Sequence, residues 1–320
     1  MTSARRPGRG VMRRLFLRGR RLRSGWRAGL YLMGYLLGLL IVETPALGLY
    51  AGYLMAQGVR SAPDLLARML PDRLPIGFTL ALKAAELAML LPLTALFCRT
   101  IDRRQWIGLG FGRGRGWQMD LLLGLGLGGA QMLAVLGIEW AGGWVSVGVP
   151  DRAALIDGLE VGVWAAGLFL VVAAGEELIF RGYLHVNLCE GMGSLPALMA
   201  TSLLFGAFHA MNPHFSWLAL LNVALAGLSL GYGRVVTGAL WLPMAYHLSW
   251  NFTQGALLSL PVSGVRYGGL LEVTDLGTAP LITGAAFGPE GGWICTLILA
   301  SSFPVLWAWG RWRSTDRPGR

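Results

Sequence analysis

Two adjacent carboxylates and an arginine stand in a part of the chain that is otherwise apolar. Glu176, Glu177 and Arg181 are the only Asp, Glu, Lys or Arg residues between Val161 and Cys189. Ionisable side chains at the centre of a bilayer are costly and usually face the protein interior. On a helix, Glu177 and Arg181 share a face and can pair, whereas Glu176 is rotated by about 100° from Glu177. Two repelling carboxylates with different partners predict a candidate general base or acid; the alternative is a structural ion pair plus one unpaired acid.

Two further polar sets follow on later apolar segments. Phe205 and His209 are four residues apart, which on a helix stacks an aromatic ring beneath an imidazole. His247 and Asn251 have the same spacing, and their imidazole and carboxamide donors suit a developing oxyanion. Taken singly, each set is explained as well by a satisfied core histidine or by hydrogen bonds between helices.

Depth in the membrane argues that the three sets meet. At 1.5 Å per residue, Glu177 lies roughly 18 Å, His209 roughly 21 Å and His247 roughly 14 Å from the cytoplasmic ends of their segments. All three levels fall near the middle of a bilayer about 30 Å thick. We therefore predict one shared site. Lys83 and Glu86, three residues apart on another segment, most simply pair with each other.

The elements that position these residues are membrane-spanning helices. The chain has 320 residues, of which 54% are hydrophobic and only 14% are charged, outside the range of ordinary soluble domains. The fold class predicted is all-α: a polytopic transmembrane helical bundle with about eight crossings and a catalytic core of four helices. The apolar windows lie at 28–57, 75–98, 117–140, 159–189, 195–211, 216–236, 238–258 and 290–310.

Five parts of the chain follow from these windows. They are an arginine-rich cytoplasmic tail (1–27), N-terminal transmembrane helices (28–157), the catalytic core (158–258), an extracytoplasmic loop (259–289), and the last transmembrane helix with a basic C-terminal tail (290–320).

The basic charge is concentrated before the first window. Residues 1–27 contain ten arginines and no acid, and their position favours a positive-inside signal over nucleic-acid binding. With eight crossings and a cytoplasmic N-terminus, 21 arginines lie on the inside and five on the outside. We predict a multi-pass protein with both termini in the cytoplasm. One lysine against 26 arginines, with abundant Gly and Ala, suggests a GC-rich bacterial genome and hence a bacterial inner membrane.

The ordered set of motifs resembles a known family. EExxxR (Glu176, Glu177, Arg181), FxxxH (Phe205, His209) and HxxxN (His247, Asn251) resemble the CAAX-processing and bacteriocin-processing intramembrane proteases, the CPBP or Abi family. The resemblance covers about residues 158–258. It implies that Glu176 activates a water with help from His209, and that Glu177 orients the site beside Arg181. It also implies that His247 and Asn251 stabilise the oxyanion.

A cofactor is left open by the sequence. Family members are commonly called metalloproteases, and Glu176, His209 and His247 are the candidate zinc ligands. There is no HExxH motif, so a metal-independent glutamate mechanism is slightly favoured. The function predicted is an integral membrane endopeptidase acting on a peptide or membrane protein, with membrane lipids as its other partners. The alternatives are a non-catalytic immunity or scaffold protein and a proton-coupled transporter, although no inverted repeat is visible.

Overall fold

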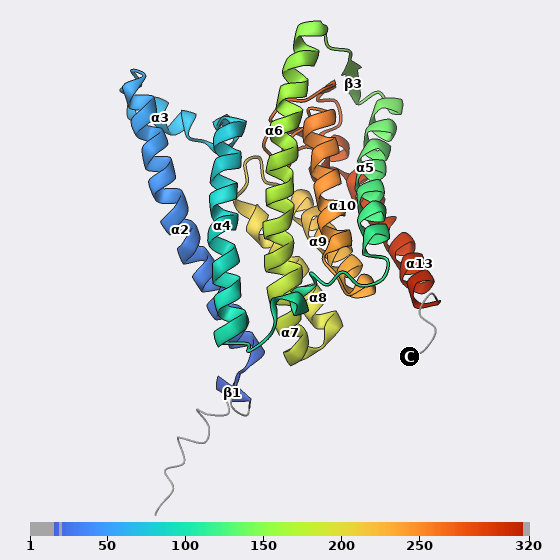
Figure 1. The fold of residues 1–320 in the computed structure, drawn as a ribbon. Helices are drawn as coiled ribbons and strands as arrows, with labels where there is room; N and C mark the ends of the chain where they lie inside the picture. Colours follow the sequence, from blue (N-terminus) through green and yellow to red (C-terminus); the bar gives the residue numbers. More distant parts are fainter. Residues whose placement is uncertain (1–15, 19–20, 316–320) are drawn as a thin grey trace, which may run out of the picture.

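A computed structural model describes residues 16–18 and 21–315 of the chain. Most of the predicted arginine-rich tail (1–27) and the last residues of the predicted basic C-terminal tail therefore lie outside the described residues. Figure 1 shows a bundle of long helices that run side by side between two ends, with β1 at the lower end and α3 and β3 at the upper end.

The prediction of an all-α membrane bundle is confirmed. Among the described residues, seven helical spans are long and apolar enough to cross a membrane. The eighth predicted crossing, over 238–258, is the 12-residue α10 followed by a five-residue π-helical turn, Thr253–Leu257. The longer helices are α2 (Ser24–Ala56), α4 (Ile76–Thr100), α5 (Trp117–Ala141), α6 (Arg152–Glu177), α7 (His185–Met192), α8 (Ser194–Phe208), α9 (Trp217–Thr237), α10 (Trp241–Phe252), α12 (Trp293–Ala300) and α13 (Ser302–Thr315).

Short elements connect the helices at the two ends. Two strand pairs, which the sequence did not predict, are antiparallel: one joins β1 to β2 and the other joins β3 to β4. The short elements are α3 (Ala62–Arg68), α11 (Pro280–Thr283), β1 (Leu17–Arg18), β2 (Arg21–Leu22), β3 (Val145–Gly148) and β4 (Glu272–Asp275). The β3–β4 pair ties the start of α6 to the segment after α10, at the end of the bundle opposite β1.

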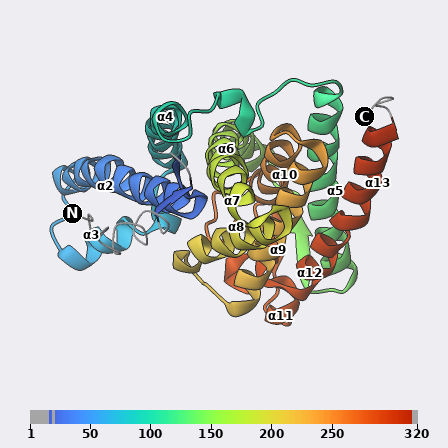
Figure 2. The ribbon, with the colours of Figure 1, turned by 90° about the horizontal axis from the view of Figure 1, so that it is seen from below.

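The outer faces of the helices are apolar, as a lipid environment requires. On α2, the side chains of Leu40, Ile41 and Leu49 are 63%, 73% and 78% exposed. Viewed along the bundle, α2 and α3 lie at one side and α5 and α13 at the other, with α6, α8, α9 and α10 between them (Figure 2). The helices that carry the predicted site are therefore central, and α2 forms an outer wall.

Two glycines allow α5 and α10 to approach closely. A Cβ atom on Gly124 would lie 2.4 Å from the Leu242 carbonyl oxygen, and one on Gly128 would lie 2.4 Å from the Tyr246 carbonyl oxygen. Both contacts are with the backbone of α10, so a side chain at either glycine requires the helix to move. Small residues of this kind bring helix backbones together in membranes. The contact fixes α10, which carries His247.

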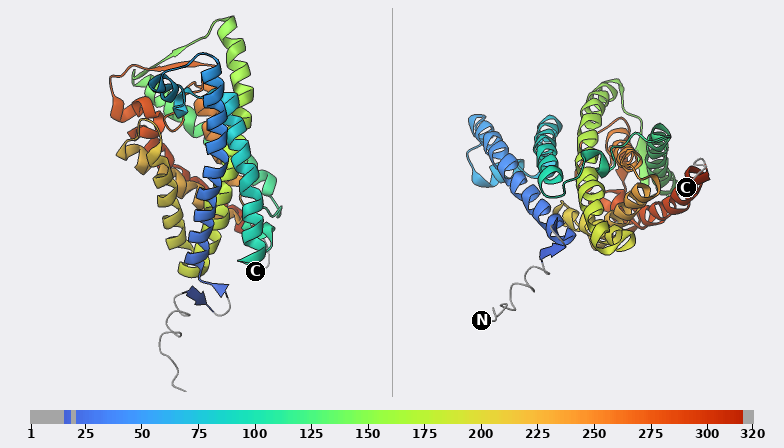
Figure 3. Two further views of the ribbon diagram at one scale, coloured as in Figure 1. Left: turned by 90° about the vertical axis from the view of Figure 1, so that its left-hand side faces the viewer. Right: turned by 60° about the horizontal axis from the view of Figure 1, so that its bottom comes forward.

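A layer of aromatic side chains fills the lower half of the bundle between α2, α4 and the segment after α6. Tyr31 and Tyr183 stack with their ring centroids 3.7 Å apart, and Phe97 meets both rings edge-on. Below this layer, Arg27 donates to Asp102 at 2.6 Å and also pairs with Glu190. These contacts hold the start of α2 against the connection after α4 and against α7. In the left view of Figure 3, the start of α2 lies at the lower end of the bundle beside the yellow-green helices.

Candidate active site

A π-helical turn follows the two glutamates. α6 ends at Glu177, and residues Leu178–Leu184, all of them buried, form π-helical turns before α7 begins. π-helical turns within helices are rare and often occur at functional sites. The four-residue spacing of Glu177 and Arg181 nevertheless still brings their side chains together. Their Oε1–guanidinium distance is 2.7 Å, so the predicted pairing is confirmed.

Glu177 is a fully buried acceptor that joins two helices. Its Oε1 accepts from Arg181 and also lies 3.0 Å from Nδ1 of His247 on α10. A carboxylate only accepts hydrogen bonds, so Nδ1 of His247 carries the proton that is donated. The neutral ring then has a bare Nε2, and His247 can donate from Nε2 only as an imidazolium. The sequence did not predict this contact between Glu177 and His247.

Arg181 extends the same network to the next helices. Its second guanidinium nitrogen donates to the carbonyl of Gly227 on α9 at 3.0 Å. The guanidinium also lies over the ring of Phe205 on α8, 4.3 Å from the centroid, a favourable cation–π distance. A buried charge with these partners locks α8 and α9 against the residues after α6. Arg181 and Phe205 therefore connect the three helical segments that carry the predicted site residues.

Glu176 has different surroundings from its neighbour. Its side chain is 28% exposed, whereas that of Glu177 is 0% exposed. Glu176 faces a cavity, where its Oε2 lies 3.9 Å from Nε2 of His247. The rotation expected between the two carboxylates is thus observed: one is committed to buried partners, and the other is available to a molecule in the cavity.

His209 lies where α8 ends and a single 3-10 turn begins. Its Nδ1 is 2.8 Å from the carbonyl oxygen of Phe205, which can only accept, so Nδ1 is the protonated nitrogen. The ring also contacts the ring of Phe205, with centroids 4.7 Å apart. These contacts leave Nε2 of the neutral ring without a proton, which is the form that a general base needs.

One cavity collects the predicted residues. It has a volume of about 470 Å³, and Glu176, His209, His247 and Asn251 all line it. They come from α6, the end of α8, and α10, and the rest of the lining is mainly apolar. The arrangement places a carboxylate, two imidazoles and a carboxamide around a space large enough for part of a peptide chain.

The helix α4, which packs against α6, carries a second polar group. Lys83 Nζ donates to both oxygens of Glu86, at 2.9 and 3.0 Å, so the predicted pair on α4 is confirmed. Both residues line the cavity, together with Tyr35 and Glu43 of α2. Lys83 is the single lysine of the chain, and its side chain remains 38% exposed. Sequence reasoning treated this pair as structural and did not place it beside the site.

The segment after α10 contributes a residue that sequence reasoning missed. Glu290 lines the cavity, and its Oε2 accepts from the backbone N–H and the hydroxyl of Ser263, at 2.6 and 2.9 Å. Ser263 in turn accepts on its carbonyl from Asn212, which follows the His209 turn. Burial raises the pKa of the Glu290 carboxyl, while the bonds from Ser263 oppose the shift. The sequence signal was slight: one acid in a glycine-rich stretch.

Zinc finds little support in this arrangement. Within residues 16–18 and 21–315, no group of three or more His, Cys, Asp and Glu side chains is arranged to hold a metal ion. The candidate ligands Glu176, His209 and His247 share the cavity but do not form such a group. No reaction step is therefore assigned to a metal.

Comparisons with known proteins agree with the motifs. Residues 159–253 match the family model described as type II CAAX prenyl endopeptidase, Rce1-like. The matched segment runs from α6 to the end of α10 and contains Glu176, Glu177, Arg181, Phe205, His209, His247 and Asn251. Comparison with curated proteins and with solved structures returned no match.

Proposed function

We propose, from the match of residues 159–253 to the Rce1-like family model, that the chain is an integral membrane endopeptidase of the CPBP/CAAX protease family. It hydrolyses a peptide bond of a membrane-associated protein or peptide with a water activated by glutamate and histidine. The observation that carries the proposal is the convergence of Glu176, His209, His247 and Asn251 on one cavity inside an apolar bundle.

Glu176 is the base that takes a proton from the attacking water. It is the carboxylate that faces the cavity, since Glu177 is committed to Arg181 and His247. His209 assists through Nε2, which its bond to the Phe205 carbonyl leaves unprotonated in the neutral ring. A general base within reach of the attacking water typically contributes about 10²–10⁴-fold to the rate.

His247 and Asn251 stabilise the oxyanion of the tetrahedral intermediate. They lie one helical turn apart on α10 and line the same cavity. Because Nδ1 of His247 already donates to Glu177, this role requires the imidazolium, whose charge the two adjacent carboxylates balance. Removing one hydrogen-bond donor that is aimed at the developing charge typically lowers kcat by about 10²–10³-fold, which corresponds to about 3–4 kcal/mol of transition-state stabilisation.

We propose that the protein lies in a bacterial inner membrane with its arginine-rich end in the cytoplasm. Support comes from the ten arginines of residues 1–27 and from the apolar spans. α2 begins and α13 ends on the β1 side of the bundle in Figure 1, which agrees with both termini on one side.

Membrane proteomics tests the proposal. Cells producing the wild-type protein are compared with cells producing Glu176→Ala, with Glu160→Ala as control because Glu160 is exposed on the same helix. We expect at least one membrane-associated polypeptide to accumulate uncleaved with Glu176→Ala and to be processed with Glu160→Ala. If both variants insert normally and processing is identical in all three strains, the endopeptidase proposal fails.

A chelator pair tests the role of metal. Once a cleaved polypeptide is identified, its turnover by the purified protein is measured with 1,10-phenanthroline and with its non-chelating 1,7 isomer. We expect equal rates with both compounds. Loss with the 1,10 isomer alone, restored by Zn²⁺, would contradict the metal-independent mechanism.

A further inference from the structure

The cavity is closed toward the arginine-rich end of the bundle. Beneath it, Tyr31 and Tyr183 are both 0% exposed and stack on one another, and Ile179 and Leu90 are buried in the same cluster. Under this layer, the buried Arg27–Asp102 pair joins α2 to the connection after α4. A polypeptide approaching from that end therefore meets a packed layer of side chains.

Toward the opposite end, the cavity is lined by the connections between helices. Met69, Pro71 and Leu74 belong to the stretch that joins α3 to α4 at the upper end of Figure 1. Met211 follows His209, lines the cavity and is 92% exposed. Ser263 and Tyr267 contribute from the segment after α10. None of the described residues between 101 and 116, at the lower end, lines the cavity.

The two ends carry opposite charge patterns. At the lower end, the connection 101–116 contains one acid, Asp102, and four arginines, and the described residues 16–18 and 21–27 add four arginines and no acid. At the upper end, the stretches 57–75, 142–151 and 258–292 together contain four arginines and six acids. The arginines of the first connection are Arg103, Arg104, Arg113 and Arg115; the six acids are Asp64, Asp72, Asp151, Glu272, Asp275 and Glu290.

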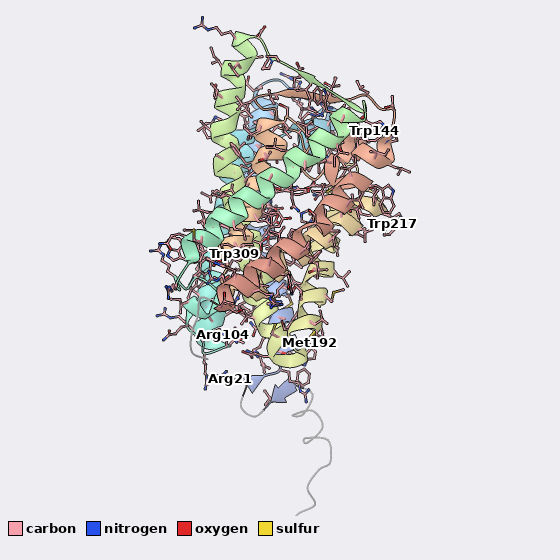
Figure 4. The ribbon with its side chains drawn as sticks, turned by 90° about the vertical axis from the view of Figure 1, so that its right-hand side faces the viewer. Arg21, Arg104, Trp144, Met192, Trp217 and Trp309 are labelled. Carbon is pink, nitrogen blue, oxygen red and sulfur yellow. The ribbon has the colours of Figure 1, made fainter. Side chains whose placement is uncertain are left out.

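The side-chain view agrees with these assignments. Figure 4 shows Arg21 and Arg104 at the end that carries β1, and Trp144 toward the other end. Arginine is retained in cytoplasmic connections, whereas tryptophan is enriched at both membrane–water interfaces. The arginine asymmetry therefore identifies the lower end as cytoplasmic, and the end to which the cavity opens as extracytoplasmic.

We infer that the cavity is loaded from the extracytoplasmic half of the membrane. Its substrate is accordingly a segment of an exported or membrane-anchored polypeptide whose cleavage site lies on that side. That the bound segment is a substrate rests on the proposed endopeptidase function. The direction of access rests instead on the lining of the cavity and on the distribution of arginines between the two ends. A polypeptide confined to the cytoplasmic face would have to cross the Tyr31–Tyr183 layer to reach Glu176.

Thiol labelling measures the direction of access without requiring turnover. Cys98, Cys189 and Cys295 are replaced by alanine, and single cysteines are introduced one at a time. Val172→Cys places a thiol in the cavity, one helical turn before Glu176. Leu276→Cys after β4 and Arg115→Cys before α5 are exposed controls at the upper and lower ends. A membrane-impermeant cationic methanethiosulfonate is applied to spheroplasts and to lysed membranes of a bacterial expression host.

We expect Val172→Cys and Leu276→Cys to react in intact spheroplasts, and Arg115→Cys to react only after lysis. Modification of Val172→Cys only after lysis, or its protection on both sides while the two controls react, would overturn the inference. If Val172→Cys does not accumulate as folded protein, Leu39→Cys on the α2 wall of the same cavity replaces it. Failure of the Glu176→Ala proteomics would leave these labelling results unchanged, so the two proposals fail separately.

Discussion

At the residue scale, Glu176 and Glu177 are adjacent in sequence and both lie near His247, but they differ in burial and in their hydrogen-bond partners. Glu177 is fully buried between Arg181 and His247, whereas Glu176 is partly exposed in the cavity. The motif places both carboxylates at the end of one helix, and the helix rotation sends them in different directions. One acid therefore maintains the site, and the other is available to the substrate.

Replacing Glu177 is expected to destabilise the protein more than replacing Glu176. Glu177→Gln leaves the guanidinium of Arg181, which is 1% exposed, without its carboxylate. Breaking a buried ion pair typically costs about 3–5 kcal/mol. The thermal midpoint of the detergent-solubilised protein should fall for Glu177→Gln and stay near that of the wild type for Glu176→Gln.

A double variant separates the ion pair from a general effect of the substitution. Adding Arg181→Met to Glu177→Gln removes the unpaired charge, and we expect it to recover part of the lost thermal stability. An unchanged midpoint in Glu177→Gln would contradict the assignment of Glu177 as the acid that holds the site together.

The buried carboxyl of Glu290 is expected to make the thermal stability of the protein depend on pH. Burial raises its pKa above the ordinary value of 4.5, so between that value and its folded pKa the folded protein retains a proton that the unfolded chain has lost. Its contribution to stability therefore falls as pH rises through the folded pKa. Glu290→Gln should flatten the dependence of the thermal midpoint on pH in this window. Glu272→Gln, an exposed acid on the same segment, should follow the wild type.

At the scale of elements, the site depends on the close contact of α5 with α10. Gly128→Ala would place a Cβ atom 2.3 Å from the Ser249 hydroxyl and 2.4 Å from the Tyr246 carbonyl, so α10 must shift. Because α10 carries His247, we expect cleavage to fall more than tenfold and stability to fall by about 1–3 kcal/mol. Gly126→Ala, on the same helix but facing open space, should leave both unchanged. Equal activity of the two variants would contradict this dependence.

The sequence predicted the elements of the site because their signals are local. Long apolar windows gave the helices, and spacings of four residues gave the pairs Glu177–Arg181 and His247–Asn251. Contacts between distant segments have no such signal. The hydrogen bond from His247 to Glu177 joins residues that are 70 positions apart in the sequence. The position of Glu290 at the cavity is set by an irregular stretch of short turns between α10 and α12. The pairing of β3 with β4 was missed for the same reason.

At the scale of the whole molecule, α2 is a wall of the cavity, and ion pairs hold its first turn at the end of the bundle that carries β1. Arg27 is 3% exposed and reaches Asp102 and Glu190. Asp102→Asn weakens the pairing of the buried Arg27 guanidinium. We expect the free energy of unfolding to fall by roughly 1–3 kcal/mol and the thermal midpoint to fall with it. Asp157→Asn, exposed near the start of α6, should have no effect on the midpoint. Equal midpoints for the two variants would contradict this function of the network.

The single lysine of the chain makes the cavity chemically addressable. Lys83 carries the only side-chain amine, and it lines the same cavity as Glu176. Reductive methylation with ¹³C-formaldehyde would thus attach ¹³C-methyl groups, which nuclear magnetic resonance detects, to one side chain inside the cavity. Its signal would follow occupancy by any compound that enters, including inhibitors of unknown binding mode, without a substrate having to be identified first.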